Sequence, residues 1–147
     1  MKTPKITVIT AAPVLSSANK LPKEGVVKQL SNRFAFLDIN NEYIHTLWPL
    51  LSSSGFKKPD YFKKGSVGAH ITLVYPDENK TLKPEYLNQK HFFSIDQLAI
   101  AELGEKSYLV LLIKSDSLIT LRKNHGLPPL LNFNGYEIGL HITIGNK

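Results

Sequence analysis

Two stretches of the chain show the alternation of apolar and polar positions that predicts a half-buried β-strand. In residues 67–73 and again in residues 138–144, every second side chain is apolar. We therefore expect one face of each strand to pack in the core, and the opposite face to carry the polar side chains. The apolar positions are Val67, Ala69, Ile71 and Leu73, and then Ile138, Leu140, Ile142 and Ile144; the opposite positions are Gly68, His70 and Thr72, and then Gly139, His141 and Thr143.

The two stretches belong to an internal repeat. His70 and His141 are separated by 141 − 70 = 71 residues, and a shift of 71 aligns the chain with itself without a gap from the middle forties to the end. Such self-similarity indicates that one supersecondary unit is used twice. Other residues that coincide under the shift are Leu47 with Leu118, Gly55 with Gly126, and Phe62 with Phe133.

Each copy of the repeat predicts a strand, a helix, a loop and a second strand. In the first copy, residues 34–39 have the aromatic and branched content of a strand, and Asn40 is a suitable cap for the helix that follows. Apolar residues then recur at helical spacing, and Pro49 should kink or shorten this helix. Gly55 is a natural end for it. The helical apolar positions are Ile44, Leu47 and Leu51.

The second copy gives the same pattern. Residues 108–113 predict a strand, and either Ser115 or Asp116 caps the next helix. Leu118 and Leu121 supply the apolar face of this helix. A glycine followed by two prolines ends it, at Gly126, Pro128 and Pro129.

The remaining segments are less regular. We expect residues 13–25 to form a loop, since they contain three proline or glycine residues. Residues 76–90 form a polar, lysine-rich connector with a short helix near residues 84–88, and residues 92–103 add strand structure. The first thirty residues are expected to contribute a further strand.

Composition places the chain among ordinary globular proteins. It has 147 residues, 42% hydrophobic, a formal net charge of +6 and no cysteine. A disulfide framework and a thiolate metal site are thereby excluded, and the positive charge favours anionic partners such as nucleotides or nucleic acid. No apolar run is long enough for a membrane span, so we expect no membrane partner. Residues 6–15 could pass for a weak secretory signal, but threonines and Pro13 interrupt them, and we expect a cytoplasmic protein.

Two His-x-Thr motifs on equivalent strands of a duplicated chain resemble the signature of the two-histidine (2H) phosphoesterase superfamily, which includes LigT-like RNA ligases and cyclic phosphodiesterases. The resemblance spans about residues 33–145 and is specific only at the motifs. It implies an α+β fold with duplicated strand-helix-strand lobes, whose antiparallel sheets face a central groove with helices outside. The lobes would cover about residues 33–75 and 106–145 of a single domain, 1–147.

The resemblance also implies a chemistry. One of His70 and His141 would act as general base and the other as general acid, while Thr72 and Thr143 donate hydrogen bonds to phosphate oxygens. It implies a phosphodiesterase for a bond that involves a 2′ oxygen: a 2′,3′-cyclic phosphate, a 2′-5′ linkage, or a cyclic or oligomeric nucleotide signal. No cofactor is needed, and no histidine or carboxylate cluster at metal-ligand spacing is evident in the sequence. Tyr75, just past the first motif strand, could stack on a base.

Two other functions stay open at this stage. The groove could bind RNA or a nucleotide without catalysis, or the histidines could hold a catalytic metal ion. The other histidines, His45, His91 and His125, are expected to have ordinary structural roles. Phe62 and Phe133 are expected to form a core pair, and the arginines, Arg33 and Arg122, could bind phosphate but are not assigned to the site.

Overall fold

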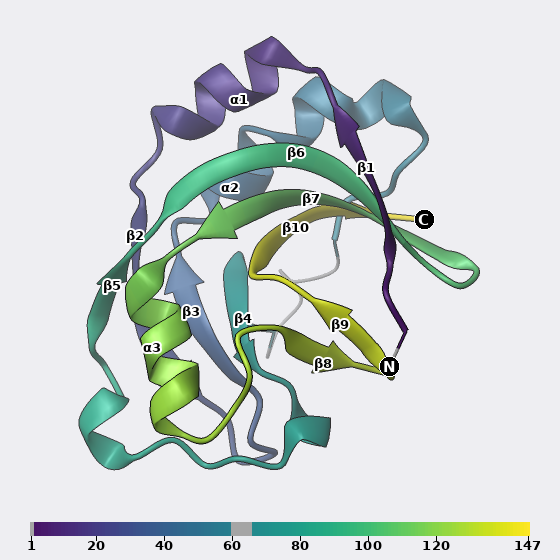
Figure 1. Ribbon diagram of the computed structural model, residues 1–147. Helices are drawn as coiled ribbons and strands as arrows, with labels where there is room; N and C mark the ends of the chain where they lie inside the picture. Colours follow the sequence, from purple (N-terminus) through teal and green to yellow (C-terminus); the bar gives the residue numbers. More distant parts are fainter. Residues whose placement is uncertain (1, 60–65) are drawn as a thin grey trace.

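The computed structural model describes residues 2–59 and 66–147 (Figure 1). Within these residues the chain forms strands, helices and short 3-10 turns. The strands are β1 (Lys5–Ile9), β2 (Glu24–Gln29), β3 (Ala35–Ile39), β4 (His70–Val74), β5 (Lys90–Phe92), β6 (Ser94–Leu103), β7 (Lys106–Lys114), β8 (Leu131–Phe133), β9 (Tyr136–Ile138) and β10 (His141–Asn146). The helices are α1 (Ala12–Asn19), α2 (Glu42–His45) and α3 (Asp116–Asn124), and the 3-10 turns are η1 (Trp48–Ser54), η2 (Pro76–Glu78) and η3 (Pro84–Tyr86).

Eight of these strands form one antiparallel sheet in the order β1-β6-β7-β10-β4-β3-β2-β5, and β8 pairs with β9 as a separate hairpin. This arrangement confirms the α+β class. The sheet has two matching halves, each a hairpin, a helix and a motif strand: β2–β3, α2 and β4 in one, β6–β7, α3 and β10 in the other. The halves are joined by hydrogen bonding between β10 and β4, so the predicted pair of sheets is one continuous sheet.

The strand expected from the first thirty residues is β1. It pairs with β6 over Lys5–Ile9 and forms the outer edge of the second half, while β5 forms the outer edge of the first half. The two outer strands therefore come from different places in the chain: β1 precedes both copies of the repeat, and β5 lies between the copies, after η2 and η3.

The sheet has one face packed in the core and one face that is open. Four fully buried side chains lie side by side across the middle of the sheet: Leu37 on β3, Ile71 on β4, Ile142 on β10 and Leu111 on β7. Figure 1 shows β6 and β7 as an arch, with α1 outside it and the β8–β9 hairpin across its opening. Because neighbouring residues of a strand point to opposite faces, the histidines and threonines of the motifs point toward the open side.

One predicted loop is wrong. Residues 13–25 were expected to be irregular, but Ala12–Asn19 forms helix α1. Pro13 lies in the first turn, where its missing amide hydrogen costs nothing, and it therefore favours this helix start. Val14 and Ala18, four residues apart on one helical face, are buried in the core.

The predicted breaks in the two repeat helices are confirmed. The first helical region splits into α2 and η1, with Pro49 in the first turn of η1, and it ends at Gly55 with φ 87°. In the second helical region, Ser115 is the N-terminal cap of α3, and its hydroxyl accepts a hydrogen bond from the Leu118 amide at 3.4 Å. Gly126 follows α3 with φ 72°. Both glycines thus adopt the left-handed conformation that side chains disfavour.

A buried ion pair connects α3 to η2, in the connector between the two copies of the repeat. Arg122 is fully buried, and its guanidinium donates to both carboxylate oxygens of Glu78, at 3.0 and 2.7 Å. It also donates to the carbonyl oxygens of Leu73, Pro128 and Leu130, at 2.7 to 2.9 Å. All its donor groups are therefore used within the protein, and it does not face a phosphate.

Candidate active site

The two motif strands are hydrogen-bonded neighbours at the middle of the sheet. Ile71 of β4 lies opposite Ile142 of β10. In an antiparallel pair, a step of one residue along each strand places His70 opposite Thr143 and Thr72 opposite His141. Each histidine therefore lies beside the threonine of the other copy, and all four side chains project from the same face of the sheet.

A cavity of about 530 Å³ opens on this face, and its wall includes both histidines and both threonines. Elements distant in sequence complete the wall: the start of the chain at Thr3, strands β6 and β7, and the β8–β9 hairpin. The structure thus brings together every residue that the motifs predicted for the site. Tyr75, the predicted stacking residue, also lines the cavity.

The two histidines have the same hydrogen-bonded arrangement. In each, Nδ1 lies 2.8 Å from the carbonyl oxygen of the glycine two residues earlier, Gly68 for His70 and Gly139 for His141. A carbonyl oxygen only accepts, so each Nδ1 carries a hydrogen and donates it. The proton that each ring can exchange with a ligand is therefore the one at Nε2.

The preceding glycines make this arrangement possible in different ways. Gly68 has φ 73°, and a Cβ at this position would lie 2.7 Å from the Asn41 side-chain oxygen. That oxygen accepts a hydrogen bond from the Ala69 amide at 3.0 Å, next to His70. Gly139 has no positive φ, and a Cβ there would meet nothing within 4 Å. Only the first motif therefore requires glycine for steric reasons.

Burial lowers the pKa of both site histidines below the ordinary value of 6.5. The hydrogen bond to the glycine carbonyl opposes this shift in each ring, because it favours the protonated form. The charge of His70 further lowers the pKa of His141. Both rings therefore favour the neutral form near pH 7, and protonation of one disfavours protonation of the other.

Aromatic rings form one side of the cavity. The ring of Phe34 lies edge-on to that of His70, with centroids 5.6 Å apart. The ring centroid of Tyr75 lies 6.3 Å from that of Phe34 and 4.8 Å from that of Phe133. The centroids of Phe133 and Tyr108 are 6.4 Å apart. These four aromatic residues all line the cavity and are called the aromatic wall below.

A comparison with family models bears on the identity of this site. Residues 35–147 match the family described as Swiss Army Knife, 2H phosphoesterase domain. The chain belongs to the 2H phosphoesterase family. No curated protein and no solved structure matches it significantly. Membership places the protein among phosphodiesterase-type enzymes whose substrates are of the nucleotide or RNA type.

Several residues of this 2H phosphoesterase site were not singled out from the sequence. Phe34, Tyr108 and Glu137 line the cavity. Phe133 was expected in a core pair with Phe62, but it lies in the aromatic wall; Phe62 lies outside the described residues. Tyr108 lies on the same face of β7 as Val110, whose partner on β10 is Thr143, and this depends on the register of the sheet. Nothing local in the sequence pointed to the hairpin residues.

The other candidate residues lie away from this cavity wall. His45 is exposed on α2, and Arg33 hydrogen-bonds to Asn79. His91 contacts the Ser117 hydroxyl and Gln89, and the Nε2 of His125 accepts from the Lys83 amide at 3.0 Å. Two lysines shortly before the first motif, Lys63 and Lys64, carry positive charges that would attract phosphate, but they lie outside the described residues.

The described part of the chain lacks two further features. Residues 2–59 and 66–147 contain no group of three or more histidine, aspartate or glutamate side chains placed to hold a metal ion. None of the helices in those ranges has the length and apolar character needed to cross a membrane.

Proposed function

We propose that this 2H phosphoesterase hydrolyses a phosphodiester bond that involves a 2′ oxygen of a nucleotide or RNA, with His70 and His141 as its acid and base and without a metal ion. Candidate bonds are a 2′,3′-cyclic phosphate, a 2′-5′ linkage, and the bonds of a cyclic or oligomeric nucleotide signal. The observation that carries the proposal is the matched pair of Nδ1–carbonyl hydrogen bonds, on adjacent strands that line one cavity. Because the motif strands pair directly, we propose that the two lobes act as one catalytic unit.

The reaction needs two proton transfers at phosphorus. The neutral ring accepts a proton at Nε2 from the attacking water, whose oxygen forms the new P–O bond. The protonated ring donates from Nε2 to the departing ribose oxygen as the old P–O bond breaks. In both rings Nδ1–H stays bonded to a glycine carbonyl, so each ring keeps its orientation during the transfer.

The threonine hydroxyls complement these transfers. Thr72 and Thr143 line the same cavity from the positions opposite the histidines. Negative charge on the nonbridging oxygens of the phosphoryl group must be stabilised in the transition state, and fixed hydroxyl donors can provide this. We propose that each threonine donates to one of these oxygens.

The electrostatics of the pair support one acid and one base. Burial disfavours charge on either ring, and the repulsion between them disfavours two protons. A bound phosphate is negative, and it raises the pKa of the rings that face it. Substrate binding therefore favours a state with one proton on the pair, which is the state that acid–base catalysis requires.

The proposal is tested with a panel of 2′,3′-cyclic, 3′,5′-cyclic, 2′-5′-linked and 3′-5′-linked nucleotides, with the products resolved as 2′- or 3′-phosphates. We expect turnover of substrates with a 2′ phosphoester bond, at rates that are unchanged by a chelator. Binding without turnover of any member would identify a binding module instead. Activity that is lost in chelator and restored by added metal would assign the histidines to metal binding.

A further inference from the structure

The peptide group between Gly68 and Ala69 is hydrogen-bonded at both ends. Its carbonyl oxygen, on Gly68, accepts from Nδ1 of His70 at 2.8 Å. Its amide, on Ala69, donates to the side-chain oxygen of Asn41 at 3.0 Å. Because a peptide group is planar and trans, the carbonyl and the amide point in opposite directions. Asn41 therefore lies at one end of a hydrogen-bonded chain whose other end is the ring of His70.

Asn41 reaches this peptide group from the start of α2. The neighbouring Asn40 satisfies the beginning of the helix, because its side-chain oxygen accepts from the Glu42 amide at 2.8 Å. The side chain of Asn41 makes no capping hydrogen bond to its own helix and bonds instead to a residue 28 positions later. This contact connects α2 to the segment that leads into β4.

The backbone at Gly68 is adapted to the contact. Gly68 has φ 73°, and the Asn41 oxygen lies 2.7 Å from the point where a Cβ would be. The oxygen thus occupies space that any other residue would fill with its side chain. Gly68 and Ala69 are both buried, so their peptide group depends on protein partners for its hydrogen bonds. Rotation of this peptide group would turn the Gly68 carbonyl away from His70, and the bond to Asn41 opposes that rotation.

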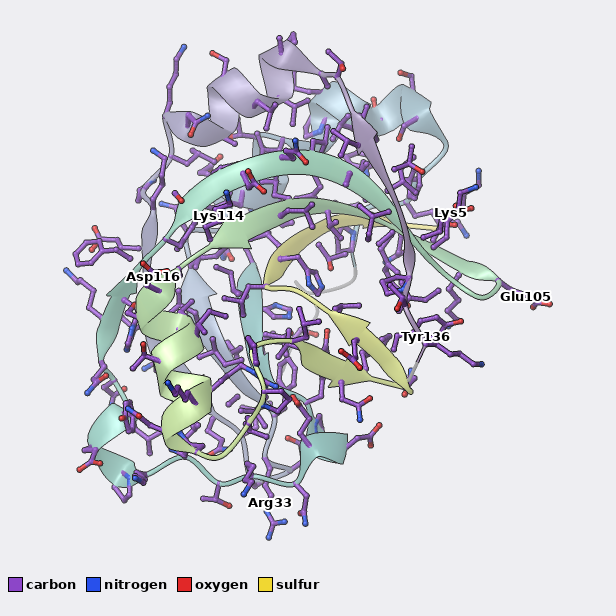
Figure 2. The ribbon with its side chains drawn as sticks, viewed as in Figure 1. Lys5, Arg33, Glu105, Lys114, Asp116 and Tyr136 are labelled. Atoms are coloured by element: carbon purple, nitrogen blue, oxygen red, sulfur yellow. The ribbon has the colours of Figure 1, made fainter. Side chains whose placement is uncertain are left out.

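The second motif lacks this support. The carbonyl of Gly139 accepts from His141 in the same way, but no side chain in the described part of the chain accepts from the amide of Leu140. The cap of the corresponding helix is Ser115, whose hydroxyl bonds to two backbone groups elsewhere. Asp116, the next residue, is exposed at the start of α3 (Figure 2). The two imidazoles are therefore held by similar first contacts but unequal second ones.

We propose that Asn41 is a positioning residue for His70, which fixes the peptide group whose carbonyl holds the ring with its hydrogen on Nδ1. The hydrogen bond that the Ala69 amide donates polarises the peptide group and strengthens the bond that the Gly68 carbonyl accepts. Such outer contacts orient a histidine and keep it in one tautomer. The inference rests on the proposed function for the catalytic role of His70, and it adds a residue that is not among those lining the cavity.

Nitrogen-15 NMR of the full chain without a ligand tests this independently of turnover. At mildly alkaline pH, where the rings are neutral, the ring nitrogen shifts report the tautomer of each histidine. We expect the Nδ1–H form to dominate for His70 and His141 in the unmodified protein. Asn41→Leu removes the acceptor and fills its space. In this variant His70 should become a mixture of both tautomers, whereas His141 should keep its form.

The same spectra, followed against pH, give a second readout with a definite sign. The bond to the Gly68 carbonyl raises the pKa of His70 because it favours the protonated ring. A weaker bond in Asn41→Leu should therefore lower that pKa. Among the described residues, the titratable groups beside His70 on the neighbouring strands are Asp38, opposite it on β3, and His141 on β10. The variant changes neither of these groups.

Three further variants separate positioning from simple stabilisation. Asn41→Asp keeps an acceptor oxygen at an exposed residue and should restore the single tautomer of His70. Asn40→Ala is the matched control, because it removes the adjacent side chain and its bond to the Glu42 amide but no bond to the peptide group before Ala69. It should leave His70 unchanged. Asn41→Ala adds no bulk and decides the question if the leucine variant does not fold, which circular dichroism checks.

The kinetic expectation depends on hydrolysis by the unmodified protein. Asn41→Leu should then lower kcat about tenfold, the scale of losing an outer contact that orients a histidine, and change KM by less than about twofold. Asn41→Asp should recover most of the rate. Absence of hydrolysis across the substrate panel would overturn the proposed function alone.

Four results would overturn the inference itself. They are an unmodified protein in which His70 is not in the Nδ1–H form, a folded Asn41 variant without an acceptor whose His70 ring is unchanged, an altered His70 ring with unchanged kcat, and equal changes in Asn40→Ala. Loss of stability alone in the Asn41 variants, with the spectrum of His70 intact, would show that Asn41 only satisfies a buried amide.

Discussion

Ile71 of β4 lies directly opposite Ile142 of β10, and both side chains are fully buried. This contact between the two copies of the repeat determines the geometry of the site. Since the isoleucines point into the core, the residues on either side of each must point to the opposite face. The histidine of one copy then lies beside the threonine of the other, and all four side chains belong to the lining of one cavity.

Replacement of either site histidine should abolish most of the activity. His70→Ala and His141→Ala should each lower kcat by roughly 10²-fold or more, the contribution of one acid–base group. Steady-state kinetics measures the loss, and thermal unfolding tests whether the fold is intact. His45→Ala is a suitable control, because His45 is exposed on α2. Retained activity in either site variant would contradict the assignment.

The pH dependence should be bell-shaped and should differ between kcat/KM and kcat. Burial lowers the pKa of His70 and His141 in the empty site, so the protonated acid becomes scarce as the pH rises above those values. At lower pH the base becomes protonated and activity falls again. The profile of kcat/KM, which reports the free enzyme, should therefore peak below pH 6.5.

Bound substrate should move the profile of kcat to higher pH, because the negative phosphate raises the pKa of the ring that acts as the acid. Initial rates from pH 5 to 9, at low and saturating substrate, measure both profiles. Two results would contradict this mechanism. One is a rate that does not change with pH although the chemical step is rate-limiting. The other is a kcat maximum at lower pH than the kcat/KM maximum.

The threonine hydroxyls should affect catalysis more than folding. Thr72→Val and Thr143→Val keep the shape of the side chain but remove the hydroxyl donor, and each should lower kcat by roughly 10²-fold, as the loss of one preorganised donor does in other enzymes. Thr72→Ser and Thr143→Ser should restore much of the rate. A large loss of unfolding free energy with unchanged kinetics would place the hydroxyls in a structural role instead.

The two motif glycines should respond differently to alanine. Gly68→Ala requires a left-handed conformation and brings a methyl group against Asn41, so it should cost at least about 1–2 kcal/mol of unfolding free energy. It should also lower activity, because the Gly68 carbonyl orients His70. Gly139→Ala has open space and should change stability by under about 0.5 kcal/mol. Denaturant titrations measure the unfolding free energies of both variants. Equal losses in the two would contradict the left-handed conformation of Gly68.

The buried ion pair should be important for stability. Arg122→Met leaves the buried Glu78 carboxylate without its partner, and Glu78→Gln leaves the buried guanidinium without a negative charge. Each variant should lose about 3–5 kcal/mol of unfolding free energy. The exposed pair of Lys90 and Glu24, 3.1 Å apart, provides the control. Lys90→Met should cost under about 1 kcal/mol. Similar losses in the buried and exposed variants would argue against a structural role for Arg122.

Most of the elements could be predicted from local sequence. The alternation around each histidine identified the motif strands, although β4 and β10 begin only at His70 and His141, and Ile138 belongs to β9 instead. The spacing of Leu118 and Leu121 identified α3, and Pro49 and Gly55 identified the break and end of the first helical region. These signals are local consequences of side-chain periodicity and backbone preference. The loop expected at residues 13–25 was wrong because proline was treated as a breaker, whereas at the start of a helix it is favourable.

The site was predictable only in part. The repeat and the two motifs pointed to His70, His141, Thr72 and Thr143, which the structure places around one cavity. Arg122 could not be assigned from sequence, because its burial depends on Glu78, which lies 44 residues earlier in the chain. Phe133 and Glu137 belong to a hairpin whose position over the sheet depends on long-range contacts, including hydrogen bonds from Arg122 to the segment before β8.

The sequence alone determined that two equivalent strands each carry a histidine and a threonine on the face opposite the core, because alternation and repetition are properties of the chain itself. Only the tertiary structure decided that these strands are direct neighbours, that each glycine carbonyl accepts from an imidazole Nδ1, and that the cavity wall, as far as the described residues form it, is mainly aromatic and aliphatic. Those features depend on contacts between segments far apart in sequence. Local patterns do not encode them, because strand order and packing are set by the burial of the whole core.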